Sequence, residues 1–284
     1  MLNLIMDYIQ TGGEFSKRIR NRHTLWWSSS HDEAFKRKEM TRYNPIHEWK
    51  KEDLWQAKLS NKFNAREFAI MHNCKTADLY WKGRDADRID FSALPAHYVI
   101  RPTAGHSANN VYIMQNGLNL FDKKRYTPEE IVQLLKTTLE AHPTQEFLIE
   151  EFLQSESGEY KILDDYKFFC FNGKIACVHI INRLGPKTGY SAFFDEHWNY
   201  MRPFHLLYPP KDGQKKPHCF DEMLEHVKRL SEAYGIFVRI DYYATAKGAV
   251  FGEFTPTPGI GKGVNKYGQK LLTQYWDKYC SGMI

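Results

Sequence analysis

The chain has 284 residues, of which 42% are hydrophobic and 26% charged, so it can bury a full core in one large domain or roughly two to three lobes. It lacks an apolar run near the roughly 18 residues of a membrane span, and its opening segment, MLNLIMDYI, lacks the basic flank and cleavage site of a signal peptide. We therefore expect a cytoplasmic protein without a membrane span. The five scattered cysteines have no CxxC spacing, which predicts reduced thiols and no zinc site.

The net charge of +5 is concentrated near the N-terminus, where residues 1–62 hold 12 Lys and Arg against 8 Asp and Glu. Residues 1–60 also have a helical pattern, so we expect a basic helical N-terminal extension. A basic arm with aromatic residues is compatible with binding to nucleic acid or to another anionic surface. The interleaved acids and the lack of a recognition motif favour a solvated helical face instead, and they disfavour nucleic acid as a partner.

The next elements are two helices and a hairpin. Pro45 opens an expected helix through Trp49 and Trp55, and a second helix is expected at residues 61–71. The hairpin has a short strand at 98–101, a polar loop at 106–110 and a returning strand at 111–115. Such a hairpin can fold over phosphates, although its loop contains a single glycine, Gly105, which makes the phosphate signal weak.

Local signals predict further elements along the chain. Thr127, Pro128 and Glu130 supply an N-cap, a first-turn proline and a capping-box acid, which predicts a helix. Two alternating runs around Asn172 and Gly173 predict a hairpin with a type I′ turn. The other expected elements are a strand at 146–153 that leads into a hinge, and an amphipathic helix at 221–234 that ends at Gly235.

The most informative stretch, residues 236–259, reads as two strands joined by a short loop that contains glycine. If Lys247 is the midpoint, Asp241 lies opposite Glu253 and Arg239 lies opposite Thr255, all on one face of the sheet. Two opposed carboxylates repel each other, so we expect a hard cation between them, most simply Mg²⁺ with an anionic ligand beyond it. The alternative is a solvated sheet face whose acids pair with Arg239 or Lys247.

In this order, the elements resemble the ATP-grasp superfamily, and within it the TupA-like branch named for teichuronopeptide biosynthesis. The resemblance covers about residues 60–275 and rests on the motifs LPAHYVIRP, FLIEEFL, DYKFFCFNGK, VRIDYY and FGEFTPTPG. It implies an α+β fold in which two lobes clamp the nucleotide. The expected domains are the extension at 1–60, a first nucleotide-binding lobe at 61–148, and a C-terminal lobe with the metal site at 149–284.

The resemblance also implies a set of ligands for the cofactors ATP and Mg²⁺. Asp241 and Glu253 would bind the metal, with Thr255 in the position usual for asparagine. Arg239 and Lys167 would be catalytic groups that face the transferring phosphoryl group or a substrate oxygen. The residues implied in nucleotide binding are Arg101, Glu150, Phe152, Leu153, Glu156, Glu159, Lys167 and Arg239, with Glu156 or Glu159 near the ribose.

The sequence departs from the family pattern in the phosphate clamp. Arg101 stands where these enzymes carry a lysine, the loop from Gly105 to Asn110 is poor in glycine, and Thr255 replaces asparagine. Arginine keeps the positive charge and threonine keeps one oxygen. His106, His179 and His205 are candidate bases, but a lone histidine in such positions is more often a structural one.

The resemblance implies an ATP- and Mg²⁺-dependent carboxylate–amine ligase that forms an amide through an acyl phosphate. Its partners would be a small-molecule or glycan-linked carboxylate and an amine. One alternative is a kinase of the same fold that phosphorylates a hydroxyl, and another is an inactive nucleotide-binding scaffold whose basic arm docks a partner. The sequence leaves the two substrates and the oligomeric state open.

Overall fold

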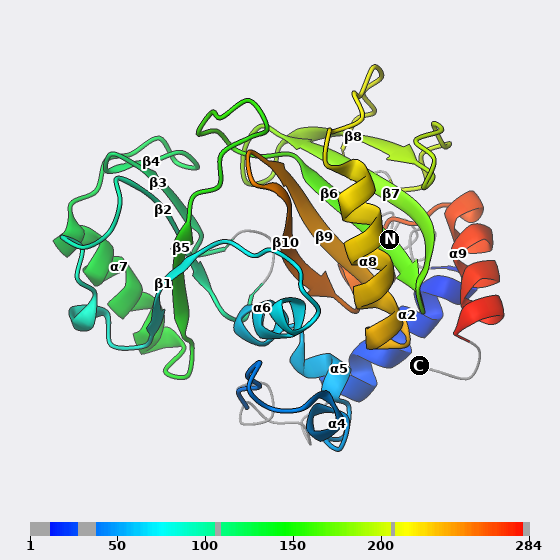
Figure 1. Ribbon diagram of the computed structural model, residues 1–284, viewed down its shortest axis with the longest axis horizontal. Coiled ribbons are helices and arrows are strands. Elements are labelled where there is room, and N and C mark those ends of the chain that lie inside the picture. The colour runs from blue at the N-terminus through cyan, green and yellow to red at the C-terminus, as the bar shows by residue number, and fades with distance from the viewer. Residues whose placement is uncertain (1–11, 28–37, 106–108, 206–207, 281–284) are drawn as a thin grey trace, which may run out of the picture.

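The computed structural model describes residues 12–27, 38–105, 109–205 and 208–280. Within these residues, two five-stranded antiparallel sheets lie next to each other (Figure 1). The first sheet has the strand order β1-β5-β2-β3-β4. Its strands are β1 (Leu79–Gly83), β2 (His97–Pro102), β3 (Tyr112–Gln115), β4 (Leu118–Asn119) and β5 (Phe147–Glu151). The strands expected at 98–101, 111–115 and 146–153 are therefore present, with small differences at their ends.

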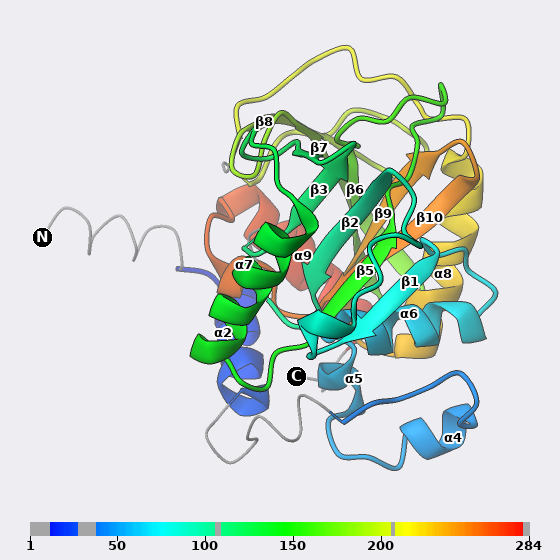
Figure 2. The ribbon, with the colours of Figure 1, turned by 90° about the vertical axis from the view of Figure 1, so that its left-hand side faces the viewer.

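One face of the first sheet is covered by helix α7 (Pro128–Ala141), which crosses in front of β2 and β3 in Figure 2. Ile131 and Leu135 of this helix pack against Ile100 and Ile149 of the sheet, together with the short helix η1 (Ala86–Arg88). The predicted capping box is confirmed, because Thr127 accepts from the backbone N–H of Glu130 while the Glu130 carboxylate accepts from that of Thr127.

The second sheet has the order β10-β9-β6-β7-β8. Its strands are β6 (Asp165–Phe171), β7 (Lys174–Arg183), β8 (Gly189–Phe194), β9 (Phe237–Thr245) and β10 (Gly248–Thr255). Helix α8 (Phe220–Tyr234) packs on one face, where it meets the even-numbered residues of β6. On the opposite face, Phe169 and Phe171 pack under helices α2 (Glu14–Trp26) and α9 (Lys266–Tyr279). The sheet is thus covered by helices on both sides.

The described N-terminal residues belong to the core of the second sheet. Helices α4 (Ile46–Trp49), α5 (Trp55–Lys58) and α6 (Lys62–Met71) share a hydrophobic cluster with α8, β9 and β10. The helix expected from Pro45 through Trp55 is instead two short helices, because Leu54 adopts left-handed backbone at φ 52° and interrupts it. None of the described helices has the length and apolar character required to cross a lipid bilayer.

Two hairpins set the register of the second sheet. Asn172 and Gly173 both have positive φ, 46° and 81°, which confirms the predicted type I′ turn. In the β9–β10 hairpin, Thr245 pairs with Gly248, so the turn has two central residues and not one. A β-bulge between Phe251 and Glu253 then shifts the pairing by one residue, which places Asp241 opposite Glu253 and Arg239 opposite Thr255. The predicted pairs are therefore correct, although they arise from a tighter turn and a bulge together.

Candidate active site

The register of the second sheet aligns one row of side chains across five strands. Lys167 of β6 pairs with Asp241 of β9 on one side and with His179 of β7 on the other, Asp241 pairs with Glu253 of β10, and His179 pairs with Phe193 of β8. Directly paired residues in an antiparallel sheet point to the same face. This is the face opposite α8, so the row is continuous with the core under α2 and α9.

Asp241 is the centre of this row and is 2% exposed. Its carboxylate accepts two hydrogen bonds of 2.7 Å from Arg239, one from Nε and one from Nη2, and a further one from Lys167 Nζ. Burial opposes ionisation, but the two cations hold the pKa of Asp241 below its ordinary value. The acid therefore pairs with Arg239, as in the alternative weighed from the sequence, but in a buried site and not on a solvated face.

Arg239 joins all the residues expected to bind the metal. Besides Asp241, its Nη2 donates to Thr255 Oγ1 at 2.8 Å and to Glu253 Oε1 at 3.3 Å. The hydroxyl of Thr255 also donates to Glu253 at 3.3 Å. Carboxylate and hydroxyl oxygens are hard donors of the kind that Mg²⁺ prefers, so these three residues fit such an ion chemically. We find no cluster of three or more His, Cys, Asp or Glu suited to a metal among the described residues, and two carboxylates suffice for Mg²⁺ with phosphate oxygens.

Lys62 was missed by sequence reasoning. Its ammonium lies 3.7 Å from Glu253 Oε2 and donates to the carbonyl of Gly105 at 3.2 Å. Burial lowers its pKa in spite of the neighbouring Glu253. It is the first residue of α6 after the N-cap Asn61, where the helix dipole disfavours a cation. A lysine directly after an N-cap, followed one turn later by Arg66, was the available sequence signal.

Arg101 points to Glu150 instead of standing free. Its Nε donates to Glu150 Oε2, and Arg66 Nη1 lies 4.0 Å from the other oxygen of the same carboxylate. Glu150 itself is buried between these two cations. Arg101, Arg66 and Glu150 therefore form a second charged cluster, on the face of the first sheet opposite α7.

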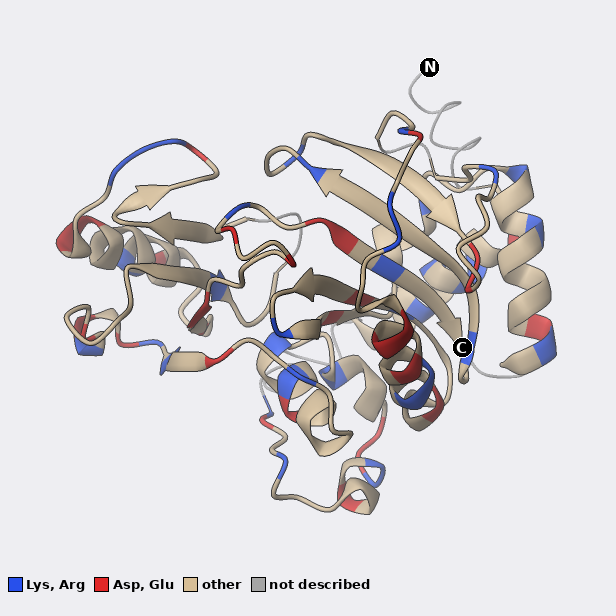
Figure 3. Ribbon diagram, turned by 45° about the horizontal axis from the view of Figure 1, so that its top comes forward, with Lys and Arg blue, Asp and Glu red and all other residues tan. Residues whose placement is uncertain are grey.

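Charged residues continue along β6 and β7. Asp165 lies 3.7 Å from Lys167 Nζ and accepts from Arg183 Nε at 3.0 Å. Burial acts to lower the pKa of Arg183, but the charge and hydrogen bonds of the neighbouring Asp165 carboxylate together have the larger effect and raise this pKa. In Figure 3, the red segment at the start of β6 is followed along the same strand by a blue one. We call the whole set the charged band: Lys62, Arg66, Arg101, Glu150, Asp165, Lys167, Arg183, Arg239, Asp241 and Glu253.

The other residues expected at the nucleotide lie outside the charged band. Leu153 packs with Ala77 and Val250, and Phe152 lies near Tyr160, with ring centroids 5.4 Å apart. Glu156 accepts from the backbone N–H of Cys219 at 3.0 Å, and Glu159 pairs with Lys161 at the surface. The polar loop expected at 106–110 falls partly outside the described residues, which resume at residue 109.

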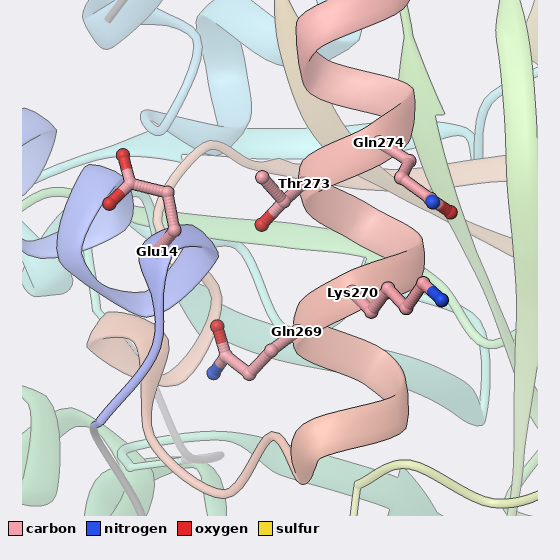
Figure 4. Close-up of a pocket in the computed structure, with 5 residues that line it drawn as sticks. All are labelled: Glu14, Gln269, Lys270, Thr273 and Gln274. Carbon is pink, nitrogen blue, oxygen red and sulfur yellow. The ribbon is translucent and has the colours of Figure 1, made fainter.

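Two shallow depressions lie away from the band. Figure 4 shows the first, of about 280 Å³, between α2 and α9, with Gln269 and Thr273 directed towards α2 and Lys270 and Gln274 directed away. The second, of about 350 Å³, is bordered by Glu156, His218, Cys219 and the β9–β10 turn. Neither is lined by a residue of the charged band, so we place the candidate site on the band and not in these depressions.

Two five-stranded antiparallel sheets, with a band of cations and carboxylates around the β9–β10 hairpin, match the ATP-grasp fold. Residues 45–276 match the model of the family described as TupA-like ATP-grasp, and the chain therefore belongs to that family. A search of curated protein sequences finds no match to the chain.

Solved structures show the same fold at low identity. D-alanine–D-alanine ligase from Bacillus anthracis superposes with a TM-score of 0.53 and 14% identity, over 79% of this chain and 68% of that one. The same enzyme in complex with ATP gives 0.50 and 12%, over 79% and 67%. The ATP-grasp ligase PsnB with its minimal precursor gives 0.44 and 12%, over 77% of this chain and 60% of that one. The chain thus spans about three fifths of the length of PsnB.

Proposed function

We propose that the protein is an ATP- and Mg²⁺-dependent carboxylate–amine ligase that acts in the cytoplasm on a small-molecule or glycan-linked carboxylate. The observation that carries the proposal is the set of contacts made by Arg239. One largely buried guanidinium bonds Asp241, Glu253 and Thr255 beside Lys167, which brings together hard oxygen donors and two fixed cations. Membership of the TupA-like ATP-grasp family supports it.

In this proposal each residue has a defined role. Asp241, Glu253 and Thr255 hold Mg²⁺, which neutralises charge on the phosphates when bound. Arg239 and Lys167 stabilise the phosphoryl group as it transfers, because a fixed guanidinium fork and an ammonium match the charge on its oxygens. Lys62 of α6 and Arg101 of β2 bind the other phosphates. The segment from Glu150 to Leu153 holds adenine, chiefly through backbone groups.

The chemistry has two steps. A carboxylate oxygen of the first substrate attacks the γ-phosphorus, the bond to the β-phosphate oxygen breaks, and ADP leaves. The amine then attacks the acyl carbon and phosphate leaves with the original carboxylate oxygen, while the amine loses a proton. The chain's contribution to both steps is position and electrostatic stabilisation, so no covalent nucleophile of the protein is needed.

The test is incubation with ATP, Mg²⁺ and pooled carboxylates, amines and sugars, followed by mass analysis of products and nucleotides. We expect ADP and phosphate, and ¹⁸O from a labelled carboxylate should appear in the released phosphate. AMP and pyrophosphate would contradict the proposal. Phosphate retained on a hydroxyl of the organic product would show the kinase alternative instead.

A further inference from the structure

Helix α2 lies before the residues that match the family, yet it runs along the loop that leaves the metal-binding strand. This loop, which we call the exit loop, comprises residues 256–261 and includes the short helix η2 (Pro258–Gly261). Arg22 Nη1 donates to the carbonyl of Pro256 at 3.3 Å, and Ser16 Oγ donates to that of Gly261 at 2.5 Å. Between them, His23 Nδ1 lies 3.5 Å from Thr257 Oγ1. One helix therefore contacts the loop near both of its ends and in its middle.

Arg22 is buried in an unusual way. Its side chain is fully buried, and its guanidinium carbon lies 4.6 Å from the centroid of Trp276 and 5.1 Å from that of Trp26. No carboxylate among the described residues pairs with it, and its Nε and Nη2 have no hydrogen-bond partner. Its bonds are to two carbonyls, Phe237 O at 2.7 Å and Pro256 O. A buried cation without an anion is costly, and burial lowers its pKa to about 10. Packing alone would be served as well by an apolar residue.

The backbone conformation of the exit loop depends on contacts with helix α2. Gly259, Ile260 and Gly261 have φ of 55°, 51° and 73°, and a positive φ is strained for the non-glycine Ile260. At Gly261, a Cβ atom would lie 2.7 Å from the backbone oxygen of Ser16, so the loop and the helix meet backbone to backbone. Such a conformation persists where its surroundings determine it, and α2 supplies those surroundings.

We propose that α2 is a positioning element of the active site, in which Arg22 and Ser16 fix the exit loop and thereby the oxygens of Thr255 and Glu253 that receive Mg²⁺. Pro256 directly follows Thr255, so a displaced Pro256 carbonyl moves the last residue of β10. The inference rests on the proposed function, because it assumes that these two residues bind the metal. Arg22 touches neither substrate nor metal and acts through the loop.

The experiment uses the full chain and compares Arg22→Gln with Ile19→Ala. Ile19 is buried on the same helix in the core with Phe15 and Trp276, so its truncation loosens α2 without removing a bond to the exit loop. Calorimetric titration with ATP, with and without Mg²⁺, is made well below both melting temperatures. We expect Arg22→Gln to weaken Mg²⁺-dependent ATP binding roughly tenfold, and Ile19→Ala to leave it within about twofold. Binding of ATP without metal should change little in either.

Arg22→Lys keeps the buried charge and one donor, so it should fold and show a smaller loss in the same direction. If Arg22→Gln and Arg22→Lys both bind Mg²⁺ and ATP as the parent does, the inference is wrong and the proposed function stands. The inference would also be overturned if the loss of Mg²⁺-dependent ATP affinity followed the loss in melting temperature in the same way in the Arg22 and Ile19 variants. A parent protein that binds no ATP with Mg²⁺ would overturn the proposed function, and the inference with it.

Discussion

At the scale of single residues, Asp241 forms ion pairs with Arg239 and Lys167. Removal of its negative charge would leave these two positive charges in a buried site. We predict that Asp241→Asn lowers the free energy of unfolding by about 3 kcal/mol, because Arg239 and Lys167 then lose their closest anion in a buried site. Urea unfolding without nucleotide measures this. Repulsion between Asp241 and Glu253 by itself would make the substitution neutral or slightly stabilising, but the ion pairs of Asp241 with Arg239 and Lys167 act in the opposite direction.

The double variant Asp241→Asn/Lys167→Met distinguishes the loss of ion pairs from the relief of carboxylate repulsion. It removes one of the stranded cations, so it should be more stable than Asp241→Asn alone. If Asp241→Asn were as stable as the parent, repulsion between Asp241 and Glu253 would outweigh the ion pairs, and the structural reading of the cluster would be wrong.

His179 gives a prediction for pH. Its ring stacks on Phe193 at 4.1 Å, and its Nε2 is buried without a hydrogen-bond partner. Burial, with His205, Lys167 and Arg239 adding to it, keeps the pKa of His179 well below the usual value. The unfolded chain therefore binds a proton that the folded chain does not, once the pH falls below about 6.5.

Stability should consequently fall as the pH drops from about 7 to about 5, by up to about 1.4 kcal/mol per pH unit from this group. His179→Phe should lose less stability over the same range, measured by urea unfolding at each pH. The exposed His218→Phe is the matched control and should keep the parent profile. Parallel profiles for the parent and the His179 variant would show that this residue does not set the acid sensitivity.

At the scale of elements, the bulge in β10 determines where Glu253 points. A Cβ atom on Gly252 would lie 3.0 Å from both the carbonyl oxygen of Asp241 and the ring of Tyr243. We predict that Gly252→Ala costs about 1–3 kcal/mol of stability and also weakens the stabilisation by Mg²⁺ and an ATP analogue. Thermal melts with and without the ligands measure both. Ala246→Ser, in the exposed turn of the same hairpin, should change neither, and equal ligand shifts in the two variants would contradict the prediction.

Elements with local signals could be predicted from the sequence. The cap at Thr127, the turn at Asn172 and Gly173, and the helix stop at Gly235 each depend on neighbouring residues alone. The pairing of Asp241 with Glu253 was predicted through a turn of the wrong length, which the bulge compensates. That bulge could not be foreseen, because contacts of Gly252 with the neighbouring strand decide it.

The parts of the site that sequence reasoning missed come from far along the chain. Lys62 reaches Glu253 only because α6 packs against β10, and Arg22 reaches Pro256 only because α2 docks beside α9. Neither of these two contacts corresponds to a periodic pattern in the sequence. The residues named from the β9–β10 hairpin do lie together, whereas Glu156 and Glu159 have other partners.

At the scale of the whole molecule, the β9–β10 turn ties the second sheet to the first. Lys247 Nζ lies 2.6 Å from Glu151 and 3.1 Å from Asp78, and Lys75 donates to the carbonyl of Lys247 at 2.8 Å. Lys247 is half exposed, so its ion pairs should add at most about 1 kcal/mol to stability. Their greater effect should be on how far the two sheets separate.

We predict that Lys247→Ala changes the free energy of unfolding by less than about 1 kcal/mol but increases the radius of gyration, measured by small-angle scattering without nucleotide. The parent in about 1 M salt should resemble the variant, because ions then screen the pairs. Lys161→Ala removes a surface pair within one loop and is the control. An unchanged radius of gyration for Lys247→Ala would show that the turn does not restrain the sheets.

The docking of α2 beside α9 also has a consequence for how the chain folds. The bonds of Ser16 to Gly261 and Gln269 span 245 and 253 residues of sequence, so each closes a loop nearly as long as the chain. Long-range contacts of this kind slow folding, because the entropy of loop closure is lost before they form. On the ribosome, Phe15 and Trp26 would leave the exit tunnel long before β9, β10 and α9 are made. Helix α2 would therefore be synthesised early but be among the last elements to dock, with its apolar face accessible to chaperones in the meantime.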